Sequence, residues 1–317
     1  MLWLIVWQLK NQEKQENLWF RIYNQKKDNK MKVGLSTYSL SRAISAGELD
    51  ILSVIQWIAD NGGKHVEISP SNLNLKDNDE LIKSIVAKAK EVNLDISSYT
   101  ISANFIQKTE KTYEGEIERI KREVDVANAL GVKLMRHDAA SRPVEETSVE
   151  QFDRDLPKCA AACTQIADYA KQYGITTSVE NHGLYMQAAE RIQRLILAVN
   201  RDNFKTTMDI GNFVCVDEVA LVSVKKNIKY ASMIHIKDFH LKDSAYNPGE
   251  GWSRTPAGNY RRGAIAGHGD IHLDLILKVI KDAGFDGYLS IEFEGMEECR
   301  IGSRIGMENT KRLWELA

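Results

Sequence analysis

Residues that constrain a chain covalently or interrupt its secondary structure are scarce in this sequence. It has four cysteines and five prolines in 317 residues, and no two cysteines form a CxxC pair. A disulfide framework and a zinc ribbon are therefore not expected. Cys159 and Cys163 are four residues apart in a helical stretch, which predicts two buried, reduced thiols on one helix face. So few prolines leave long helices and strands uninterrupted.

An excess of charge of one sign is also missing, since 42 basic residues oppose 44 acidic ones and the net charge is −2. Binding to a nucleic-acid backbone depends on a basic excess that displaces counterions, so no nucleic-acid partner is expected. The apolar run at residues 1–9 is far shorter than the ~20 residues of a membrane span, and it lacks the basic flank and cleavage site of a signal peptide. We expect no membrane partner and a cytoplasmic location.

The first 30 residues differ in composition from the rest of the chain. A stretch rich in Lys, Gln and Asn, residues 10–30, follows the apolar run, and Met31 then opens a β-rich segment. This pattern predicts a disordered or irregular extension over residues 1–30 that is not part of the core, with a leader peptide as the alternative. Residues 31–317 are predicted to form one domain.

From Met31 onward, short β-rich runs alternate with longer helical patterns, as in consecutive βαβ units. Glycines that end helices recur before strands, at Gly131, Gly174 and Gly284. The predicted strands span residues 32–36, 65–69, 95–99, 133–137, 176–180, 205–209, 232–236 and 288–292. Eight such units predict an α/β fold, a single (β/α)8 TIM barrel. The rival fold, an open doubly wound sheet, usually has a glycine-rich phosphate loop after its first strand, and the sequence has none there.

Four polar residues fall at the ends of four consecutive predicted strands. Glu180, Asp209 and Glu292 end the fifth, sixth and eighth strands, and His235 lies in the seventh. Because barrel enzymes build their sites at the carboxyl ends of the strands, these side chains are expected around one pocket. Three crowded carboxylates would raise each other's pKa values, and a divalent cation removes that penalty. The pattern therefore predicts one metal ion held by all four residues.

Each of these residues also has a structural alternative. His235 could be a hydrogen-bonded core residue, Asp209 a helix N-cap and Glu292 a surface ion-pair partner, whereas a metal site explains all of them together. Three oxygen ligands and one nitrogen favour Mn²⁺ or Mg²⁺, leave Co²⁺ or Zn²⁺ open, and exclude a thiolate site.

The segments that carry these residues resemble those of the xylose isomerase-like barrel superfamily, in particular its sugar phosphate isomerase/epimerase group. They are VENHG, MDIGN, HIKDFH and LSIEFEG, and the opening MKVGLSTYSLSRAI and the closing GHGDIHLDLILKVIKDAGFDGYLSIEFEG are similar too. The resemblance covers residues 31–317. It is more specific for the fold and the metal than for the substrate, because the superfamily includes isomerases, epimerases, dehydratases and lyases.

The resemblance places the family's metal ligands on Glu180, Asp209, His235 and Glu292, and it implies that Glu180 and Glu292 also form the acid/base pair. The metal would hold a hydroxyl and a carbonyl oxygen of the sugar and stabilise an enediolate, while one carboxylate removes a proton from carbon and the other returns it. Glu294 lies two residues after Glu292, on the same side of the strand, so geometry leaves both open as the ligand. The family pattern selects Glu292.

Further polar residues near predicted strand ends and in one long connection are candidate substrate ligands. They are Glu67, His182, Asn212, Lys237, His240, Arg262, His268 and Glu294. The long connection lies between His235 and Asp270, and a loop of that length at one end of a barrel is predicted to be functional. A structural hydrogen bond is the alternative role for each candidate.

One position departs from the family pattern. Several family members have His three residues after the strand-six Asp, and here that position is Asn212. The related endonuclease branch, which cuts DNA at abasic sites, needs that His and further His ligands on strands two and three. The strand-three segment contains no His, so a three-metal DNA-repair site is not expected, in agreement with the net charge.

The sequence supports two enzymatic functions and one without catalysis. The first is a divalent-metal-dependent isomerase or epimerase of a sugar or sugar phosphate. The second is a lyase or dehydratase that uses the same site for elimination from a keto-sugar, a 3-keto-glycoside or an inosose, since only the fate of the enolate differs. The third is a metal-free barrel that binds a sugar. The partner is in each case a small carbohydrate, and a homo-oligomer stays open because no interface is evident.

Overall fold

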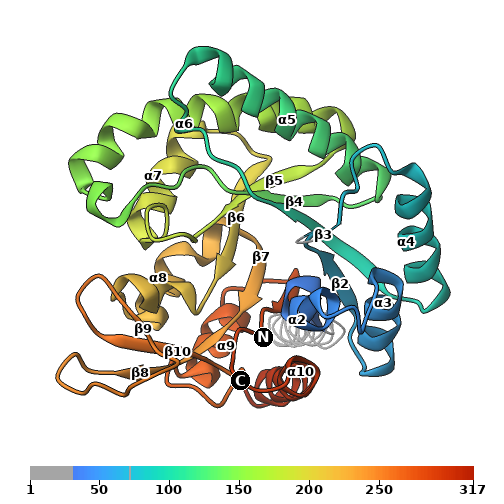
Figure 1. The fold of residues 1–317 in the computed structure, drawn as a ribbon, viewed down its shortest axis with the longest axis vertical. Coiled ribbons are helices and arrows are strands. Elements are labelled where there is room, and N and C mark those ends of the chain that lie inside the picture. Colours follow the sequence, from blue (N-terminus) through green and yellow to red (C-terminus); the bar gives the residue numbers. More distant parts are fainter. Residues whose placement is uncertain (1–30, 71–72) are drawn as a thin grey trace, which may run out of the picture. The chain divides into compact units, whose positions relative to one another are not determined.

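Eight parallel strands close into a barrel in the computed structural model, which describes residues 31–70 and 73–317 (Figure 1). Around the barrel the strands run β1 (Lys32–Ser36), β11 (Tyr288–Ile291), β7 (Ala231–Ile236), β6 (Phe204–Asp209), β5 (Thr176–Glu180), β4 (Leu134–His137), β3 (Asp95–Ile101) and β2 (His65–Ile68). These are the eight predicted strands, with no end displaced by more than two residues. The predicted (β/α)8 barrel is confirmed. The extension predicted over residues 1–30 lies outside the described residues.

Helices cover the outside of the barrel (Figure 1). The longer ones are α3 (Ile51–Asp60), α4 (Asp79–Glu91), α5 (Glu110–Ala129), α6 (Val149–Ala170), α7 (Ala189–Val199), α8 (Ala220–Asn227), α9 (Leu273–Asp282) and α10 (Cys299–Leu316). Short helical turns are η1 (Thr37–Leu40), α2 (Ser41–Ser45), η2 (Val144–Glu146), η3 (Lys171–Tyr173), η4 (Asn212–Val216) and η5 (Ile228–Tyr230). Over the residues that the structure describes, no helix is both long and apolar enough to cross a membrane.

Local sequence specifies where these helices begin and end. Asp50 caps α3 by accepting a hydrogen bond from the Ser53 amide, as an aspartate at this position commonly does. The predicted helix-ending glycines are confirmed, because Gly131, Gly174 and Gly284 all have φ between 63° and 76°. This left-handed conformation suits glycine and lets the chain turn from a helix into the next strand.

The two cysteines of α6 lie on its inner face. Cys159 and Cys163 are fully buried, and both are free thiols. This confirms the prediction of small buried residues that share one face of a helix.

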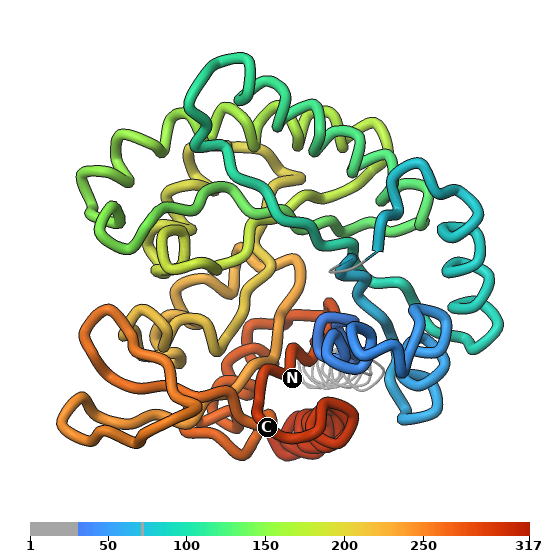
Figure 2. The backbone as a smooth tube through the Cα atoms, viewed as in Figure 1, coloured from blue at the N-terminus to red at the C-terminus, as the bar shows by residue number. Residues whose placement is uncertain are grey.

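The segment after β7 differs from the predicted long loop. It contains a three-stranded antiparallel sheet of β8 (Asp238–Lys242), β9 (Ser253–Arg254) and β10 (Tyr260–Ala264), in the order β8-β10-β9. Figure 2 shows the orange loops of this sheet projecting to one side of the barrel. The strands are short, and Gly249, Gly251 and Gly258 between them have positive φ. These glycines give the segment the composition of a loop, which explains why the sheet is not evident in the sequence.

Alternation along the strands brings polar side chains into the barrel. Glu180 and Asp209 take inward positions at the ends of β5 and β6, whereas the preceding residues, Val179 and Met208, are fully buried on the outer face. Parallel strands covered by helices are buried on both faces, so an inward carboxylate is removed from bulk water. The fold thus gathers charged groups at the carboxyl end of the barrel.

Candidate metal centre

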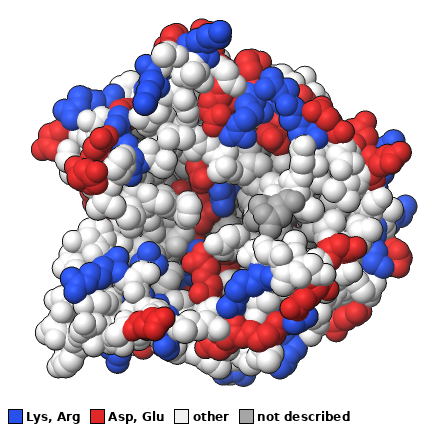
Figure 3. Space-filling model, in the orientation of Figure 1, with Lys and Arg blue, Asp and Glu red and all other residues white. Residues whose placement is uncertain are grey.

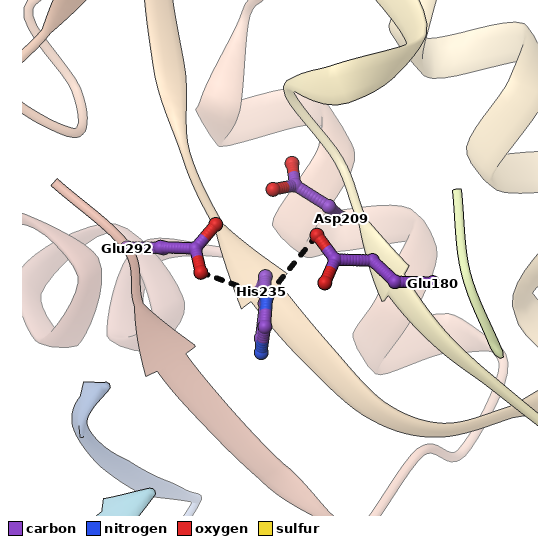
Figure 4. Close-up of side chains that lie close together, drawn as sticks. All are labelled: Glu180, Asp209, His235 and Glu292. Carbon is purple, nitrogen blue, oxygen red and sulfur yellow. Dashed lines mark ion pairs between the residues drawn. The ribbon is translucent and has the colours of Figure 1, made fainter. Parts of the chain in front are cut away.

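Four side chains from adjacent barrel strands converge at the carboxyl end of the barrel (Figure 4). Glu180 and Asp209 end β5 and β6, His235 lies one residue before the end of β7, and Glu292 directly follows β11. Each offers one ligand atom, and these four atoms all lie within 4.8 Å of one another. All four residues are buried, the most accessible being 6 % exposed. The structure therefore brings together the four residues that the sequence predicts as ligands.

Asn181 holds the ends of β5 and β6 together. Its side chain accepts a hydrogen bond from the Asp209 amide and donates one to the Asp209 carbonyl, both at 2.8 Å. Asp209 Oδ1 accepts from the amides of Gly211 and Asn212, at 2.8 and 2.9 Å, which leaves Oδ2 for the cluster. Gly211 is required there, because an added Cβ would lie 2.6 Å from the carbonyl oxygen of Lys237.

The His235 ring lies between the two glutamates (Figure 4). Its Nδ1 is 3.6 Å from Glu180 Oε1 and 3.7 Å from Glu292 Oε1. The other ring nitrogen, Nε2, is 2.8 Å from Glu67 Oε2. The imidazole therefore presents Nδ1 to the cluster and Nε2 to a carboxylate outside it.

Two cations contact the carboxylates of the cluster. Arg136 Nη2 lies 2.9 Å from Glu180 Oε2. Lys237 Nζ lies 2.6 Å from Glu292 Oε2 and 3.2 Å from Asp209 Oδ2. The positive charges are thus placed beside the two glutamates, with Lys237 shared between Glu292 and Asp209.

This arrangement separates the pKa values of the three carboxyls. Burial by itself would raise the pKa of Glu180, but the Arg136 charge outweighs it and lowers that pKa to about 2. Burial would likewise raise the pKa of Glu292, and the charges of Lys237 and His235 hold it well below its ordinary value. Burial raises the pKa of Asp209 to about 7 against the opposing Lys237 charge, and the negative glutamates add to the rise. Of the three carboxyls, Asp209 is the one whose pKa is raised, mainly because of its burial.

The cluster fits a divalent cation. His235 Nδ1 is buried without a hydrogen-bond partner, and the carboxylate oxygens beside it are 3.6 and 3.7 Å away, which is costly unless a further group contacts it. The Lys237 ammonium lies 3.2 Å from Asp209 Oδ2. Three carboxylate oxygens and one imidazole nitrogen, with no sulfur, form a donor set that suits ions such as Mg²⁺, Mn²⁺, Co²⁺ and Zn²⁺. The four residues could therefore hold one metal ion.

A polar cavity of about 430 Å³ opens above the cluster. Figure 3 shows a hollow near the centre of this face, where acidic and basic side chains gather. Glu180, Glu292 and Lys237 form part of the cavity wall. Its other ionisable lining residues are Tyr38, Lys76, Tyr99, Arg119, Glu123, Arg136, Asp138, His182 and Glu294. The volume and the mixture of charges suit a small polar ligand.

Several predicted substrate ligands lie at this cavity. His182, Lys237 and Glu294 line it. Asn212 lies beside the cluster, where its Nδ2 donates to Glu180 Oε1 at 3.1 Å and its Oδ1 accepts from Lys237 at 3.4 Å. Glu67 is fully buried and is not part of the cavity wall. Substrate contact by these residues stays a prediction.

The remaining three candidates, His240, Arg262 and His268, are not part of the cavity wall. His240 in β8 pairs with Arg262 in β10, and the Arg262 guanidinium lies 5.0 Å from the centre of the Trp252 ring. His268 is exposed in the connection that precedes α9. Their role as substrate ligands also stays a prediction, and the shape of this cavity does not support it.

Some residues of the cavity wall have no recognisable signal in the sequence. Tyr38 lies in η1, Tyr99 in the middle of β3 and Arg119 in α5, and only the tertiary fold brings them together. Arg136 and Asp138 differ, because Arg136 lies one residue before the end of β4 and Asp138 directly follows the strand. The rule that barrel sites form at strand ends identifies these two positions.

Comparison with known proteins identifies the family. The profile of the xylose isomerase-like TIM barrel family matches residues 55–313, and the chain belongs to this family. The chain is similar to an inosose dehydratase from Clostridium perfringens, with 26 % identity over 222 residues, which cover 66 % of this chain and 73 % of the relative. It is also similar to an inosose isomerase from Bacillus licheniformis, with 27 % identity over 210 residues, 65 % of this chain and 70 % of the relative. Both relatives are enzymes.

Solved structures share the fold at lower identity. The probable 3-DHS dehydratase involved in petrobactin synthesis from Bacillus anthracis has 16 % identity and a TM-score of 0.68, and the match covers 88 % of this chain and 97 % of that one. A xylose isomerase-like TIM barrel protein from Mycobacterium smegmatis in complex with magnesium has 17 % identity and a TM-score of 0.64, with coverage of 84 % and 87 %. At these identities the likeness establishes the fold alone.

Proposed function

We propose that this protein is a divalent-metal-dependent isomerase or epimerase of a small, unphosphorylated polyhydroxy ketone. The observation that carries the proposal is the position of Glu180 and Glu292, which face each other across His235 with Asp209 beside them (Figure 4). With two carboxylates on opposite sides of one binding point, one can remove a proton from one face of a carbon. The other can then return a proton to the opposite face or to the neighbouring carbon. The similarity to an inosose isomerase supports a ketone with several hydroxyls as the substrate class.

Mn²⁺ or Mg²⁺ is the proposed ion, with Glu180, Asp209, His235 and Glu292 as its ligands. When bound, such an ion supplies positive charge beside the carbonyl and hydroxyl oxygens of the substrate, where negative charge develops as the proton leaves. The predominance of oxygen donors supports these two ions. The magnesium complex of a protein with the same fold agrees with this choice.

The two glutamates are prepared for proton transfer by their neighbours. Arg136 holds Glu180 Oε2 at 2.9 Å, and Lys237 holds Glu292 Oε2 at 2.6 Å. These contacts keep both side chains ionised and fix their orientation, and each glutamate retains one oxygen, Oε1, on the side of His235. Either carboxylate can thus accept the proton from the carbon next to the carbonyl, and the proton returns to carbon in the second step.

The charges of the cavity wall favour an uncharged substrate. Arg119 pairs with Glu116 at 2.8 Å, and Arg136 pairs with both Glu180 and Asp138. In the part of the chain that the structure describes, Lys76 is the one lysine or arginine of the wall without a carboxylate partner. A phosphate dianion is usually held by several donors, including arginine. A neutral ketose or inosose fits this balance better than a sugar phosphate.

Elimination of water is a second candidate function. Lys237 lies between Glu292 and Glu294, at 2.6 and 3.3 Å, on the wall of the cavity. After a glutamate has taken the proton from carbon, the carbon–oxygen bond of a neighbouring hydroxyl would break, and a proton from Lys237 would let the oxygen leave as water. The similarity to an inosose dehydratase supports this alternative.

Exchange of carbon-bound hydrogen with solvent deuterium tests the proposal. Neutral ketoses, inososes and their phosphates would be incubated with the protein and Mn²⁺ or Mg²⁺, with and without a chelator. We expect exchange with a neutral ketone, no exchange after chelation, and one metal ion per chain. Exchange with retention of the hydroxyls supports isomerisation or epimerisation, and release of water supports elimination. Absence of exchange throughout the panel, or full activity after chelation, would contradict the proposal.

A further inference from the structure

A fully buried carboxylate, Glu67 of β2, lies behind the candidate metal centre. It is outside the ligand cluster and is not part of the cavity wall. Its Oε2 is 2.8 Å from His235 Nε2 and accepts a hydrogen bond from the Ser290 hydroxyl at 3.4 Å. Its Oε1 is buried without a hydrogen-bond partner.

Burial of a carboxylate in this environment lowers the free energy of unfolding. Transfer of an ionised group out of water costs several kcal/mol even when it is paired, as a rough general figure. In the described part of the chain, no lysine or arginine forms an ion pair with Glu67, and His235 is its one ion-pair partner. A buried pair of this kind is weak evidence for a stabilising role, so its position beside a ligand residue needs a different explanation.

The placement of Glu67 across the barrel points to that explanation. The strands β11 and β1 separate β2 from β7, so Glu67 reaches His235 through the interior of the barrel. The imidazole thus has carboxylates on two sides, with Nδ1 toward Glu180 and Glu292 and Nε2 toward Glu67. A neutral histidine that binds a metal through one nitrogen carries its proton on the other. A carboxylate beside Nε2 favours the proton there and leaves the Nδ1 lone pair to the cluster.

We propose that Glu67 is a positioning residue for the metal ligand His235, whose tautomer and ring orientation it fixes. The inference rests on the metal centre of the proposed function. It gives Glu67 a role different from the contact with a substrate hydroxyl that the sequence predicts. A carboxylate behind a metal-bound imidazole also makes the imidazole a stronger donor, and loss of such a partner typically weakens metal affinity about 10–100-fold.

The test compares Glu67→Gln and Glu67→Leu with the wild-type protein. Calorimetry gives the Mn²⁺ affinity, and thermal unfolding gives the Tm of the metal-free and Mn²⁺-saturated forms. We expect Glu67→Leu to bind Mn²⁺ about 10–100-fold more weakly. Glu67→Gln should lose less, because its amide oxygen keeps an acceptor beside Nε2.

Ser98→Ala is the matched control. Ser98 is the strand partner of Glu67 in β3, is 1 % exposed, and its hydroxyl has no hydrogen-bond partner. Its removal should leave the Mn²⁺ affinity unchanged. If Glu67→Leu does not fold, the loss of affinity in Glu67→Gln relative to Ser98→Ala decides the question.

Two outcomes in the variants would overturn the inference. Unchanged Mn²⁺ affinity in the Glu67 variants with a lower metal-free Tm would show that Glu67 serves the fold alone. Unchanged affinity with a raised KM would show that it contacts the substrate. A wild-type protein that binds no Mn²⁺ would instead overturn the proposed metal centre. This result can be told apart from failure of the Glu67 inference, because it is obtained with the wild-type protein alone.

Discussion

The three carboxylates of the cluster differ in the positive charge that each one faces. Glu180 has Arg136 on its outer oxygen, and Glu292 has Lys237 at 2.6 Å. Asp209 shares Lys237 at a longer distance of 3.2 Å and uses its other oxygen to accept from two backbone amides. The two glutamates are therefore kept as carboxylates, while Asp209 depends most on an added cation.

Glu180→Gln tests whether this site catalyses a reaction or only binds a sugar. With saturating Mn²⁺, we expect hydrogen exchange to fall by about 10²–10⁴-fold, because an amide cannot accept the proton. The affinity for the ketone should change much less. Exchange rate and ligand binding would be measured on the same preparation. A barrel that only binds sugar would show equal affinity in both proteins and no exchange in the wild type.

Glu292 and Glu294 can be separated as metal ligands by two parallel variants. Glu292 is buried and belongs to the four-residue cluster, whereas the Glu294 side chain is 33 % exposed and contacts Lys237, at 3.3 Å, and Tyr38. We expect Glu292→Gln to lose bound Mn²⁺ on dialysis and Glu294→Gln to retain one ion per chain. Elemental analysis of both proteins decides this. The reverse pattern would transfer the ligand role to Glu294.

Arg136 should control the acid limb of the activity profile. Burial raises the pKa of Glu180, and the Arg136 charge opposes it strongly enough to bring that pKa to about 2. Arg136→Met removes the largest effect that opposes burial and leaves only the smaller one of His235, so the carboxylate is protonated at higher pH and activity is lost earlier on acidification. The profile of kcat/KM against pH measures the shift. Arg136→Lys keeps the charge and should remain close to the wild type, and an unmoved limb in Arg136→Met would refute the assigned role.

Strand ends, rather than single side chains, set the geometry of the site. Asn181 links the end of β5 to the end of β6 through two hydrogen bonds with the backbone of Asp209. Asn181→Ala would leave a buried amide and a buried carbonyl unpaired, at a cost of about 1–3 kcal/mol each in the free energy of unfolding. We also expect weaker Mn²⁺ binding. Urea unfolding and calorimetry measure the two effects.

A suitable control for this prediction is Asn61→Ala. The Asn61 side chain also donates to a backbone carbonyl, that of Trp57, but it lies at the accessible end of α3. Its loss should cost less than that of Asn181 and should not change Mn²⁺ affinity. Equal effects of the two substitutions would mean that Asn181 has no special role at the strand ends.

The elements also show what the sequence can reveal. The eight barrel strands were predictable because each is a compact β-rich run with a helical pattern after it, and the ligands because each falls at a strand end. The sheet of β8, β9 and β10 was not, since β9 spans only Ser253–Arg254 between glycine-rich turns. Strand alternation predicts that Glu67 points inward, but not that it lies too deep to reach the cavity. The contributions of Tyr38 and Arg119 depend on contacts between distant elements, which alternation does not describe.

Over the whole molecule, the cluster should link metal binding to folding. A ligand that binds only the folded state stabilises it by an amount that grows with its concentration, about 4 kcal/mol at 1,000 times the Kd. The four ligands come from β5, β6, β7 and the end of β11, so a bound ion would connect half of the barrel strands. These four strands are neighbours in the barrel, and unfolding of any one of them would separate the ligands, so the ion should make the unfolding of this half of the barrel more cooperative.

The pH dependence of metal-free stability follows from Asp209. Its pKa rises from an ordinary 3.8 to about 7 in the folded protein, so between these values the folded state holds a proton that the unfolded state has released. This contribution to the free energy of unfolding is complete below pH 4 and is lost as the pH rises through 7, at about 1.4 kcal/mol per pKa unit. Asp209→Asn cannot titrate, so the difference in stability between the variant and the wild type should change between pH 5 and pH 8. Urea unfolding of both metal-free proteins at these two pH values measures that change, and a constant difference would show that the pKa of Asp209 is not raised in the folded protein. Mn²⁺ competes with the same proton, so its stabilisation of the wild type should be larger at pH 8 than at pH 5.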